Sequence, residues 1–470
     1  MPKNRKFRLI ETEWPEFGRC PSPPQQPLSE FRRRIDHAME RMERSGLTHL
    51  VVYGDREHFA NLMYLTGFDP RFEEALFILR PGTKPLLLVG NEGMGHLPVS
   101  PLFSAGLLRV ERYQPFSLIS QPRNQSRFLR EILREEAITH ESIVGCVGWK
   151  YFTEEEQPEP GQALELPGFV VDALRELAGK ERVHSSTALF MNPDDGIRTR
   201  CGRFEIAYFE YSNILASEGV KNMIFGAKEG MLDYELVSLA RLSGEPLGAH
   251  PSVKTAATRH YSLASPVGGV IRRGDPLSMS LCYWGSNSCR AGWAVAGSDE
   301  LPEESRQYVQ DFAGPYFEVV ASWLEALKIG ADAKALTDWI FAELPFERFG
   351  IFLNPGHLIH LDEWVSSPFS VDSKVFLQSG MAIQTDIIPK SPVFFSSRME
   401  DGVVLADATL RSDLKSEFPE CFERCQARRD FLERSLGIHL SEDVLPLSNI
   451  SALVPPYFFR PNSVFALDEG

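Results

Sequence analysis

The sequence predicts an α/β protein with two domains. A chain of 470 residues exceeds what a single hydrophobic core usually serves, so two domains are the default expectation. Strand-like segments alternate with helical segments over roughly residues 30–185, which is the pattern of an α/β domain. A cluster of Pro, Asp and Gly at Met191–Gly196 marks a boundary. We therefore expect an extended arm at 1–29, an α/β domain at 30–190 and a second domain at 191–470.

Local signals place the elements of the first domain. Residues 1–29 are rich in Pro and Gln, which favours an extended chain. A helix should begin near Ser29, because Phe31, Ile35 and Met42 follow at helical spacing. Short runs of β-branched and aliphatic residues between turn signals indicate strands. On this basis strands are predicted at 48–53, 75–79 and 85–89, and helices at 128–136 and 171–180.

Phe204–Ala207 resembles the helix that opens the catalytic domain of the creatinase, aminopeptidase P and prolidase family, and this resemblance implies a helix that continues to about Gly219. Strands are expected between and after the later helices, and they carry the residues of chemical interest. The later helices are predicted at 234–242, 309–327 and 333–344, with a charged helical addition at 410–436.

Composition excludes several classes of function. A net charge of −15 disfavours binding to nucleic acid or to an anionic membrane, because both would repel the chain. No apolar run reaches the ~18 residues of a membrane span, and the basic N-terminus lacks the apolar core of a signal peptide. Seven cysteines without an export signal indicate reduced thiols. We expect a cytoplasmic protein that binds neither nucleic acid nor membrane.

Four short segments in the C-terminal half have the order and spacing of an active site. They are Gly274-Asp275, Asn354-Pro-Gly-His357, Gly380–Asp386 and Arg398-Met-Glu400-Asp401. These segments resemble the creatinase, aminopeptidase P and prolidase family, and the resemblance covers about residues 30–410. It implies a creatinase-like N-terminal α/β domain, a catalytic domain of the pita-bread fold, and a homodimer that acts on a small-molecule substrate.

The resemblance also implies a degenerate metal site. The family binds two metal ions with two Asp, one His and two Glu. The position six residues after Gly274 is Ser280, and the position eleven further on is Ala291, where the family has an Asp that bridges both ions. Alanine cannot coordinate a metal, and a neutral serine hydroxyl is a poor ligand. We therefore expect no two-metal centre and no cofactor.

Three of the family's ligand positions remain occupied by His357, Asp386 and Glu400. The alternative to a metal-free site is one divalent ion held by these three residues, since three protein ligands and a water can hold one ion. Within the family, creatinase hydrolyses a guanidinium C–N bond without metal, with a His as the acid/base and carboxylates that hold the cationic substrate. The expected catalytic residues are therefore His357, His260, Glu400 and Asp386, with the base left open between the two histidines.

Aromatic residues gather in the same segments. Rings beside Asp386 and Glu400 would favour a small organic cation through cation–π contact, and an arginine would hold a substrate carboxylate. The simpler alternative for each ring is packing in the core. The expected substrate-binding residues are Tyr283, Trp284, Trp293, His360, Trp364 and Arg398.

The function predicted from these residues is hydrolysis of a small C–N substrate, such as an amidine, an amide or an Xaa-Pro-like compound. Two alternatives stay open. The first is a non-catalytic pseudo-peptidase that binds a ligand or a protein, and the second is an Xaa-Pro peptidase that uses one metal ion. The strongly acidic composition does not separate them.

Overall fold

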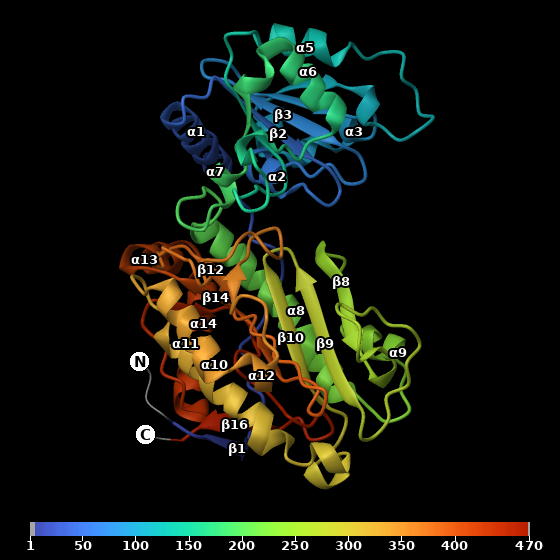
Figure 1. The fold of residues 1–470 in the computed structure, drawn as a ribbon, viewed down its shortest axis with the longest axis vertical. Helices are drawn as coiled ribbons and strands as arrows, with labels where there is room; N and C mark the ends of the chain where they lie inside the picture. Colours follow the sequence, from blue (N-terminus) through green and yellow to red (C-terminus); the bar gives the residue numbers. More distant parts are fainter. Residues whose placement is uncertain (1–4, 469–470) are drawn as a thin grey trace. The chain divides into compact units, whose positions relative to one another are not determined.

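The computed structural model describes residues 5–468, and the chain divides into two compact units (Figure 1). The N-terminal unit is Gln26–Arg198, and the C-terminal unit joins the segment up to Gln25 to everything from Thr199 onward. The first unit therefore extends beyond the predicted boundary at 190. The reason is that Tyr64 donates a hydrogen bond of 2.9 Å to the carbonyl of Ile197, which holds the predicted boundary turn to this unit.

The N-terminal unit is built on a six-stranded mixed sheet with the order β5-β4-β3-β2-β6-β7. Strands β2 and β3 and strands β3 and β4 pair antiparallel, whereas the other neighbours are parallel. The strands are β2 (His49–Gly54), β3 (Ala75–Leu79), β4 (Leu86–Val89), β5 (Arg109–Arg112), β6 (Val144–Val147) and β7 (Val183–Ser185). The helices are α1 (Leu28–Arg44), α2 (Ala60–Thr66), α3 (Gly93–His96), α4 (Pro101–Ser104), α5 (Leu129–Glu135), α6 (Gly168–Ala178) and α7 (Ala188–Met191).

Alternation of side chains along β2 explains the layers of this unit. Val51 and Tyr53 belong to the core formed with α5 and α6. Gly54 faces the other way, because a Cβ atom there would lie 3.2 Å from the Cβ of Leu62 in α2. Helices therefore cover both faces of the sheet, as the alternating pattern of strands and helices predicts.

The C-terminal unit contains two four-stranded antiparallel sheets and a two-stranded one. The first sheet has the order β13-β10-β9-β8 and the second has the order β11-β12-β14-β15. The strands of the first sheet are β8 (Leu247–Lys254), β9 (Pro276–Tyr283), β10 (Ser286–Trp293) and β13 (Arg398–Glu400). Those of the second are β11 (His357–Leu358), β12 (Ala382–Gln384), β14 (Gly402–Leu405) and β15 (Val444–Pro446).

The third sheet corrects the prediction for the N-terminal arm. Strand β1 (Phe7–Glu11) pairs antiparallel with β16 (Ser463–Leu467), so this part of the arm is an edge of the C-terminal unit. Trp14 is buried and donates a hydrogen bond of 3.0 Å to the carbonyl of Pro461. Composition favours an extended chain but does not reveal a strand partner more than 450 residues away. The arm's residues 1–4 lie outside the described residues.

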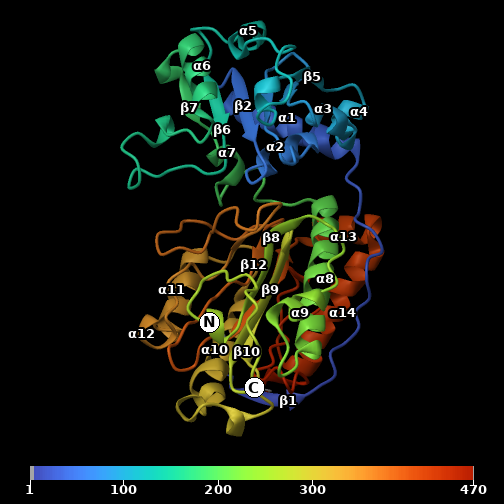
Figure 2. The ribbon, with the colours of Figure 1, turned by 90° about the vertical axis from the view of Figure 1, so that its right-hand side faces the viewer.

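Seven helices complete the described part of the C-terminal unit. They are α8 (Arg203–Gly226), α9 (Asp233–Ser238), α10 (Gly314–Ala326), α11 (Ala333–Glu343), α12 (Phe346–Phe349), α13 (Ala408–Glu417) and α14 (Pro419–Leu436), and a π-helical turn at Val309–Ala313 precedes α10. Helix α8 packs on β9 and β10, and α13 and α14 run beside it (Figure 2). Within residues 5–468 no helix is long and apolar enough to span a membrane.

The helix that opens the second domain was predicted to end at about Gly219, and this prediction is wrong because of how the helix packs. Helix α8 continues to Gly226, and Gly219 does not end the helix but lets it approach strand β9 closely. A Cβ atom at Gly219 would lie 2.3 Å from Cδ1 of Leu281 in β9. The helix can therefore lie close to the sheet only where a glycine leaves room.

The two four-stranded sheets meet at Asp401, the single residue between β13 and β14. Arg290 of β10 donates to both carboxylate oxygens of Asp401 at 3.0 and 2.8 Å, and both side chains are buried. The same guanidinium donates to the carbonyls of Cys289, Glu400, Ile450 and Leu453. This ion pair fixes the point at which the chain passes from one sheet to the other.

The first testable prediction concerns this ion pair. Asp401→Asn should lower the free energy of unfolding by about 3–5 kcal/mol, because it leaves the buried Arg290 charge without its counter-ion. Urea denaturation measures the change. The control Asp338→Asn removes an exposed ion pair with Lys334 and should cost less than ~1 kcal/mol. Equal effects of the two substitutions would contradict the importance of the Arg290–Asp401 pair.

Candidate active site

Three of the predicted catalytic residues form one buried group. One ligand atom each of His357, Asp386 and Glu400 lies within 4.8 Å of the others, and all three side chains are buried. His357 begins β11, Asp386 follows β12, and Glu400 ends β13. The group thus lies between the two four-stranded sheets. The backbone N–H of Thr385 donates to the carbonyl of Asp401 at 3.1 Å, which brings Asp386 and Glu400 together.

His357 is held by an aromatic ring and a carboxylate. Its imidazole stacks on Trp364, with ring centroids 4.2 Å apart and an interplanar angle of 19°. Its Nε2 lies 3.3 Å from Oε1 of Glu363, and its Nδ1 lies 3.2 Å from the carbonyl oxygen of Leu358. Burial opposes protonation, but the negative charges of Glu363 and Asp386 outweigh it and raise the pKa of His357. Trp364 therefore acts as a platform for the imidazole of His357.

The two carboxyl groups of the cluster are tightly coupled. Burial is the main cause that raises the pKa of Asp386 and of Glu400, and the shift of Glu400 is the larger. The positive charges of His357 and Arg398 oppose this rise at Asp386, whereas the negative charge of Asp386 adds to it at Glu400. Oδ1 of Asp386 is buried and accepts no hydrogen bond. The cluster therefore offers an acid/base pair and one unsatisfied acceptor.

The register of the first sheet shows what surrounds this group. Residues directly opposite in antiparallel strands point to the same face of the sheet. One row contains Ser252, Ser280, Cys289 and Glu400, and the next row contains Lys254, Ser278, Ala291 and Arg398. The two positions that lack the family's Asp ligands therefore share a face with Glu400 and with two basic residues.

Arg398 is the cation nearest to the carboxyl pair in this row. Its Nη1 donates to Sγ of Cys289 at 3.5 Å, and its buried Nε has no hydrogen-bond partner. Burial opposes its charge, but Cys289, Asp386 and Glu400 together raise the pKa of Arg398 above the ordinary value. The guanidinium therefore stays charged and keeps one donor available. Arg290, by contrast, is fully engaged by Asp401 and by carbonyl groups.

These residues do not fit a two-metal centre. Ser280 and Ala291 supply no carboxylate, and Lys254 and Arg398 bring positive charge to the row in which a bridging ligand would stand. A single ion does fit, because His357, Asp386 and Glu400 offer one nitrogen and two oxygen donors within 4.8 Å, and Oδ1 of Asp386 is an unsatisfied acceptor.

Several predicted site residues lie elsewhere. Tyr283 differs in parity from Ser280 and points to the opposite face of β9, where Leu281 meets α8. Trp284 lies in the turn between β9 and β10. Trp293, at the far end of β10, packs edge-to-face on Tyr308 with ring centroids 6.1 Å apart. His260 lies in an exposed loop after β8 and is not part of the buried group.

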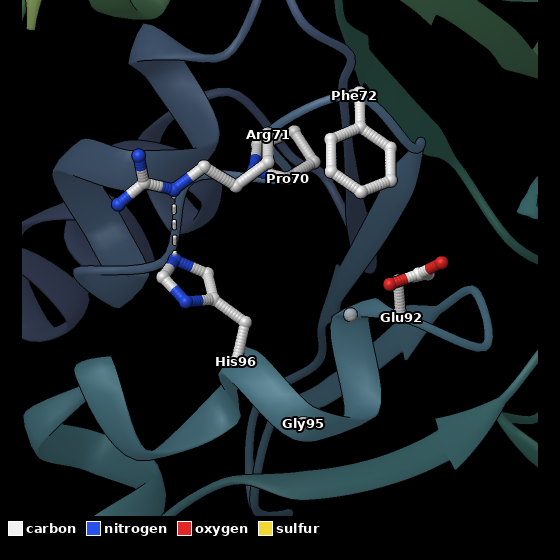
Figure 3. Close-up of a pocket in the computed structure, with 7 residues that line it drawn as sticks. Pro70, Arg71, Phe72, Glu92, Gly95 and His96 are labelled. Carbon is white, nitrogen blue, oxygen red and sulfur yellow. Dashed lines mark hydrogen bonds between the residues drawn. The ribbon is translucent and has the colours of Figure 1, made fainter.

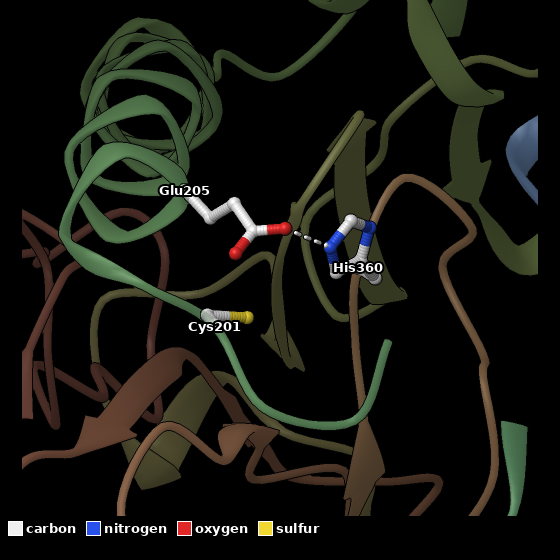
Figure 4. A group of neighbouring side chains, drawn as sticks. All are labelled: Cys201, Glu205 and His360. Carbon is white, nitrogen blue, oxygen red and sulfur yellow. Dashed lines mark hydrogen bonds and ion pairs between the residues drawn. The ribbon is translucent and has the colours of Figure 1, made fainter. Parts of the chain in front are cut away.

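His360 belongs to a second group. Its Nε2 lies 2.8 Å from Oε1 of Glu205 at the start of α8, and Cys201 lies beside them (Figure 4). The sequence prediction placed His360 with the substrate, whereas the structure pairs it with a carboxylate 155 residues away. Glu205 carries a local signal as the third residue of a helical capping box, but that signal gives no partner outside the helix.

Sequence reasoning also missed Glu363, Cys289 and Lys254. Glu363 directly precedes Trp364, so the motif that located one could have suggested the other. Cys289 and Lys254 have no motif. Their place follows only from strand register, and the pairing of β8 with β9 contains two register shifts that no spacing rule reveals.

The sequence matches no family profile and no curated protein. Solved structures do resemble the fold. A prolidase from Pyrococcus horikoshii matches with a TM-score of 0.60 at 16% identity, over 80% of this chain and 95% of that one. An Xaa-Pro dipeptidase from Bacillus anthracis matches with a TM-score of 0.60 at 13% identity, over 81% of this chain and 96% of that one. An X-Pro aminopeptidase from Thermotoga maritima matches with a TM-score of 0.59 at 14% identity, over 79% of this chain and 95% of that one. This chain has the prolidase fold. The predicted fold class is confirmed.

The N-terminal unit of the prolidase-fold chain contains a pocket of about 300 Å³ (Figure 3). It is lined by Pro70, Arg71, Phe72, Glu92, Gly93, Gly95 and His96. Asp69 engages its two basic residues, at 3.0 Å from Nε of Arg71 and 3.1 Å from Nε2 of His96. These basic groups are therefore already paired, and the pocket does not compete with the buried group as a site of chemistry.

The second prediction tests the electrostatics of the site. Burial first, and then Arg398 and Lys390, lower the pKa of the half-buried Lys254 to about 8. Because the fold disfavours its charged form, Lys254→Met should stabilise the protein at pH 7 by about 1 kcal/mol, allowing for partial exposure. The advantage should disappear as the pH rises from 8 through the ordinary lysine pKa of about 10.4.

Urea denaturation of wild type and variant at pH 7 and at pH 10 measures the difference in the free energy of unfolding at each pH. Lys374→Met, which removes an exposed lysine, is the control and should show no such pH-dependent difference. A Lys254→Met variant that is less stable than wild type at pH 7 would show that the ammonium is favourably paired, contrary to this electrostatic account.

Proposed function

We propose that this chain is a hydrolase that cleaves a C–N bond in a small substrate, and that it works without a two-metal centre. The observation that carries the proposal is the convergence of His357, Asp386 and Glu400 in one buried group between the two sheets. The names of the structural neighbours, all prolidases, dipeptidases or aminopeptidases, support C–N cleavage as the reaction class.

The unsatisfied groups of the site favour a substrate that carries both charges. Oδ1 of Asp386 is a buried acceptor without a donor, and Nε of Arg398 is a buried donor without an acceptor. Buried polar atoms are normally paired, so each indicates a ligand group of the opposite kind. A compound with a cationic nitrogen and a carboxylate would satisfy both, which fits guanidino acids, betaine-like compounds and Xaa-Pro dipeptides.

The chain's own residues can manage the proton that hydrolysis transfers. Water adds its oxygen to the carbon, the C–N bond breaks, and the proton of the water ends on the leaving nitrogen. His357, held in place by Trp364 and Glu363, is positioned to carry that proton. Asp386 and Glu400 would hold the cationic part of the substrate, and Arg398 would hold its carboxylate.

A mononuclear peptidase is the second candidate, because the donor set fits one divalent ion. His357, Asp386 and Glu400 would hold it. Such an ion supplies polarisation of a carbonyl group and a bound water that ionises near neutral pH. The two candidates use the same three residues and therefore differ in their response to a chelator and not in their response to mutation.

We further propose that the protein is a cytoplasmic homodimer. No disulfide involves any of the seven cysteines, all of which lie within residues 5–468, and this suits a reducing compartment. The dimer follows from the resemblance to the creatinase and prolidase family, and light scattering of the purified protein tests it.

The third prediction addresses the acid/base. A screen of guanidino, betaine-like and Xaa-Pro compounds should yield a substrate, and His357→Ala should lower its turnover by ~10²–10⁴-fold because the proton carrier is lost. Circular dichroism should show an intact fold. His260→Ala is the parallel variant, and its exposed position predicts a much smaller effect.

The outcomes separate the alternatives. An equal loss with His260→Ala would assign the base to the exposed loop. Inactivation by EDTA, reversed by a divalent ion, would establish the mononuclear peptidase if His357→Ala also abolishes binding of that ion. If no compound is turned over but one raises the melting temperature, the chain is a binding protein with a peptidase fold.

The fourth prediction concerns Arg398. Arg398→Met should weaken binding of a carboxylate-bearing ligand by ~10–100-fold, because a charge-assisted hydrogen bond contributes about 1.5–3 kcal/mol. Binding of the same ligand with its carboxylate amidated should be nearly unchanged by the substitution. Calorimetric titration measures both, with Arg273→Met at an exposed arginine as the control. Equal losses for the two ligands would remove the carboxylate from the proposed substrate.

A further inference from the structure

Cys201, Glu205 and His360 form a second buried group with three different donor types. One ligand atom of each lies within 4.8 Å of the others, and all three side chains are buried. The residues come from separate places in the C-terminal unit, since Cys201 precedes α8, Glu205 lies in its first turn, and His360 follows β11. None of them belongs to the group formed by His357, Asp386 and Glu400.

The donors point to a common position. Nε2 of His360 lies 2.8 Å from Oε1 of Glu205. In Figure 4 the thiol of Cys201 lies on the same side of the imidazole as this carboxylate and not beside the other ring nitrogen. A proton relay of the Cys–His–acid kind needs the thiol and the acid at opposite nitrogens. Convergence on one nitrogen is instead the arrangement of ligands around an ion.

The local fold holds the donors in place from both sides. Oε2 of Glu205 accepts the backbone N–H of Gly202 at 2.8 Å, which leaves Oε1 directed at the histidine. The backbone N–H of Cys201 donates to the carbonyl of Gly380 at 2.7 Å. Phe209 contacts the imidazole of His360 edge-on, with ring centroids 5.0 Å apart. The three positions are therefore defined by contacts that do not depend on an ion.

Charge balance favours a divalent ion at this position. Burying separate charges is costly unless they are compensated. A divalent cation with a thiolate, a carboxylate and a neutral imidazole gives a net charge of zero. One sulfur, one nitrogen and one oxygen donor suit Zn²⁺, which accepts all three and completes a tetrahedron with a water molecule.

We propose that Cys201, Glu205 and His360 bind one structural zinc ion. The ion would tie the first turn of α8 to the segment that leaves β11, and β11 begins with His357. Zinc would therefore stabilise the support of the candidate active site without taking part in its chemistry. The proposal does not depend on the hydrolase assignment, because its readouts are metal content and spectra.

Elemental analysis of the full chain, purified without chelator, should find about one zinc per chain. After removal of zinc, added Co²⁺ should give the near-ultraviolet charge-transfer band of a cobalt–thiolate bond. Cys201→Ser and His360→Gln should lower zinc affinity more than about 100-fold, because even an outer-shell partner is worth ~10–100-fold. Removal of zinc should also lower the melting temperature of the wild type.

Two controls separate this group from the candidate active site. Cys289→Ser removes another buried thiol, the one opposite Glu400, and should leave the cobalt band and the zinc content unchanged. His357→Ala should likewise retain zinc. The cobalt spectrum of the wild type tests the proposal even if a variant that lacks one ligand does not fold. A wild type that takes up neither zinc nor cobalt, or a band that survives Cys201→Ser and disappears in Cys289→Ser, would overturn the proposal.

Discussion

The candidate active site depends on the buried ion pair between Arg290 and Asp401. The site lies between two sheets, and neither sheet alone carries all three of its central residues. Asp401 is the residue at which the chain passes from one sheet to the other, and Arg290 holds it from the middle of β10. Glu400 precedes Asp401 directly, and the carbonyl of Asp401 accepts the N–H of Thr385, the neighbour of Asp386. One ion pair therefore sets the separation of both carboxyl groups. Because a buried charge without its partner is strongly destabilising, neither residue can be replaced alone without loosening the site.

The face that this ion pair supports carries basic side chains beside the two carboxyl groups. Where the resemblance leads one to expect two aspartates, the sheet has Ser280 and Ala291, and the row of Ala291 also contains Lys254 and Arg398. Asp386 and Glu400 consequently lie near the guanidinium of Arg398 and contribute, with Cys289, to its raised pKa. A charge fixed to the backbone can neutralise and orient a ligand, but unlike a metal it offers no open coordination position. A site built in this way would differ in its chemistry from a two-metal site on the same fold.

The sequence predicts the site well where a motif is local and poorly where strand register decides. His357, Asp386 and Glu400 lie in one group, and Trp364 stacks on His357, because each is located by a short motif or by its spacing from one. Tyr283 points away because it differs in parity from Ser280, and one residue along a strand reverses the face. The sequence could not show that Lys254 lies near the site, because two register shifts between β8 and β9 determine which residue it pairs with. The same limit applies to the fold, in which β2 to β4 were predicted within one residue whereas the pairing of β1 with β16 joins opposite ends of the chain.

His357 and His360 show how a short segment can serve two chemically distinct groups. They are three residues apart, yet one imidazole stacks on Trp364 beside two carboxyl groups and the other is held between Phe209 and Glu205. Each ring has one aromatic contact and one carboxylate, so each is fixed in orientation and in the nitrogen that it presents. Because both rings are buried and belong to the same segment, a shift of either would displace the other through the backbone. Glu205 of α8 therefore holds the segment that directly follows His357, although no side chain of α8 belongs to the His357 group.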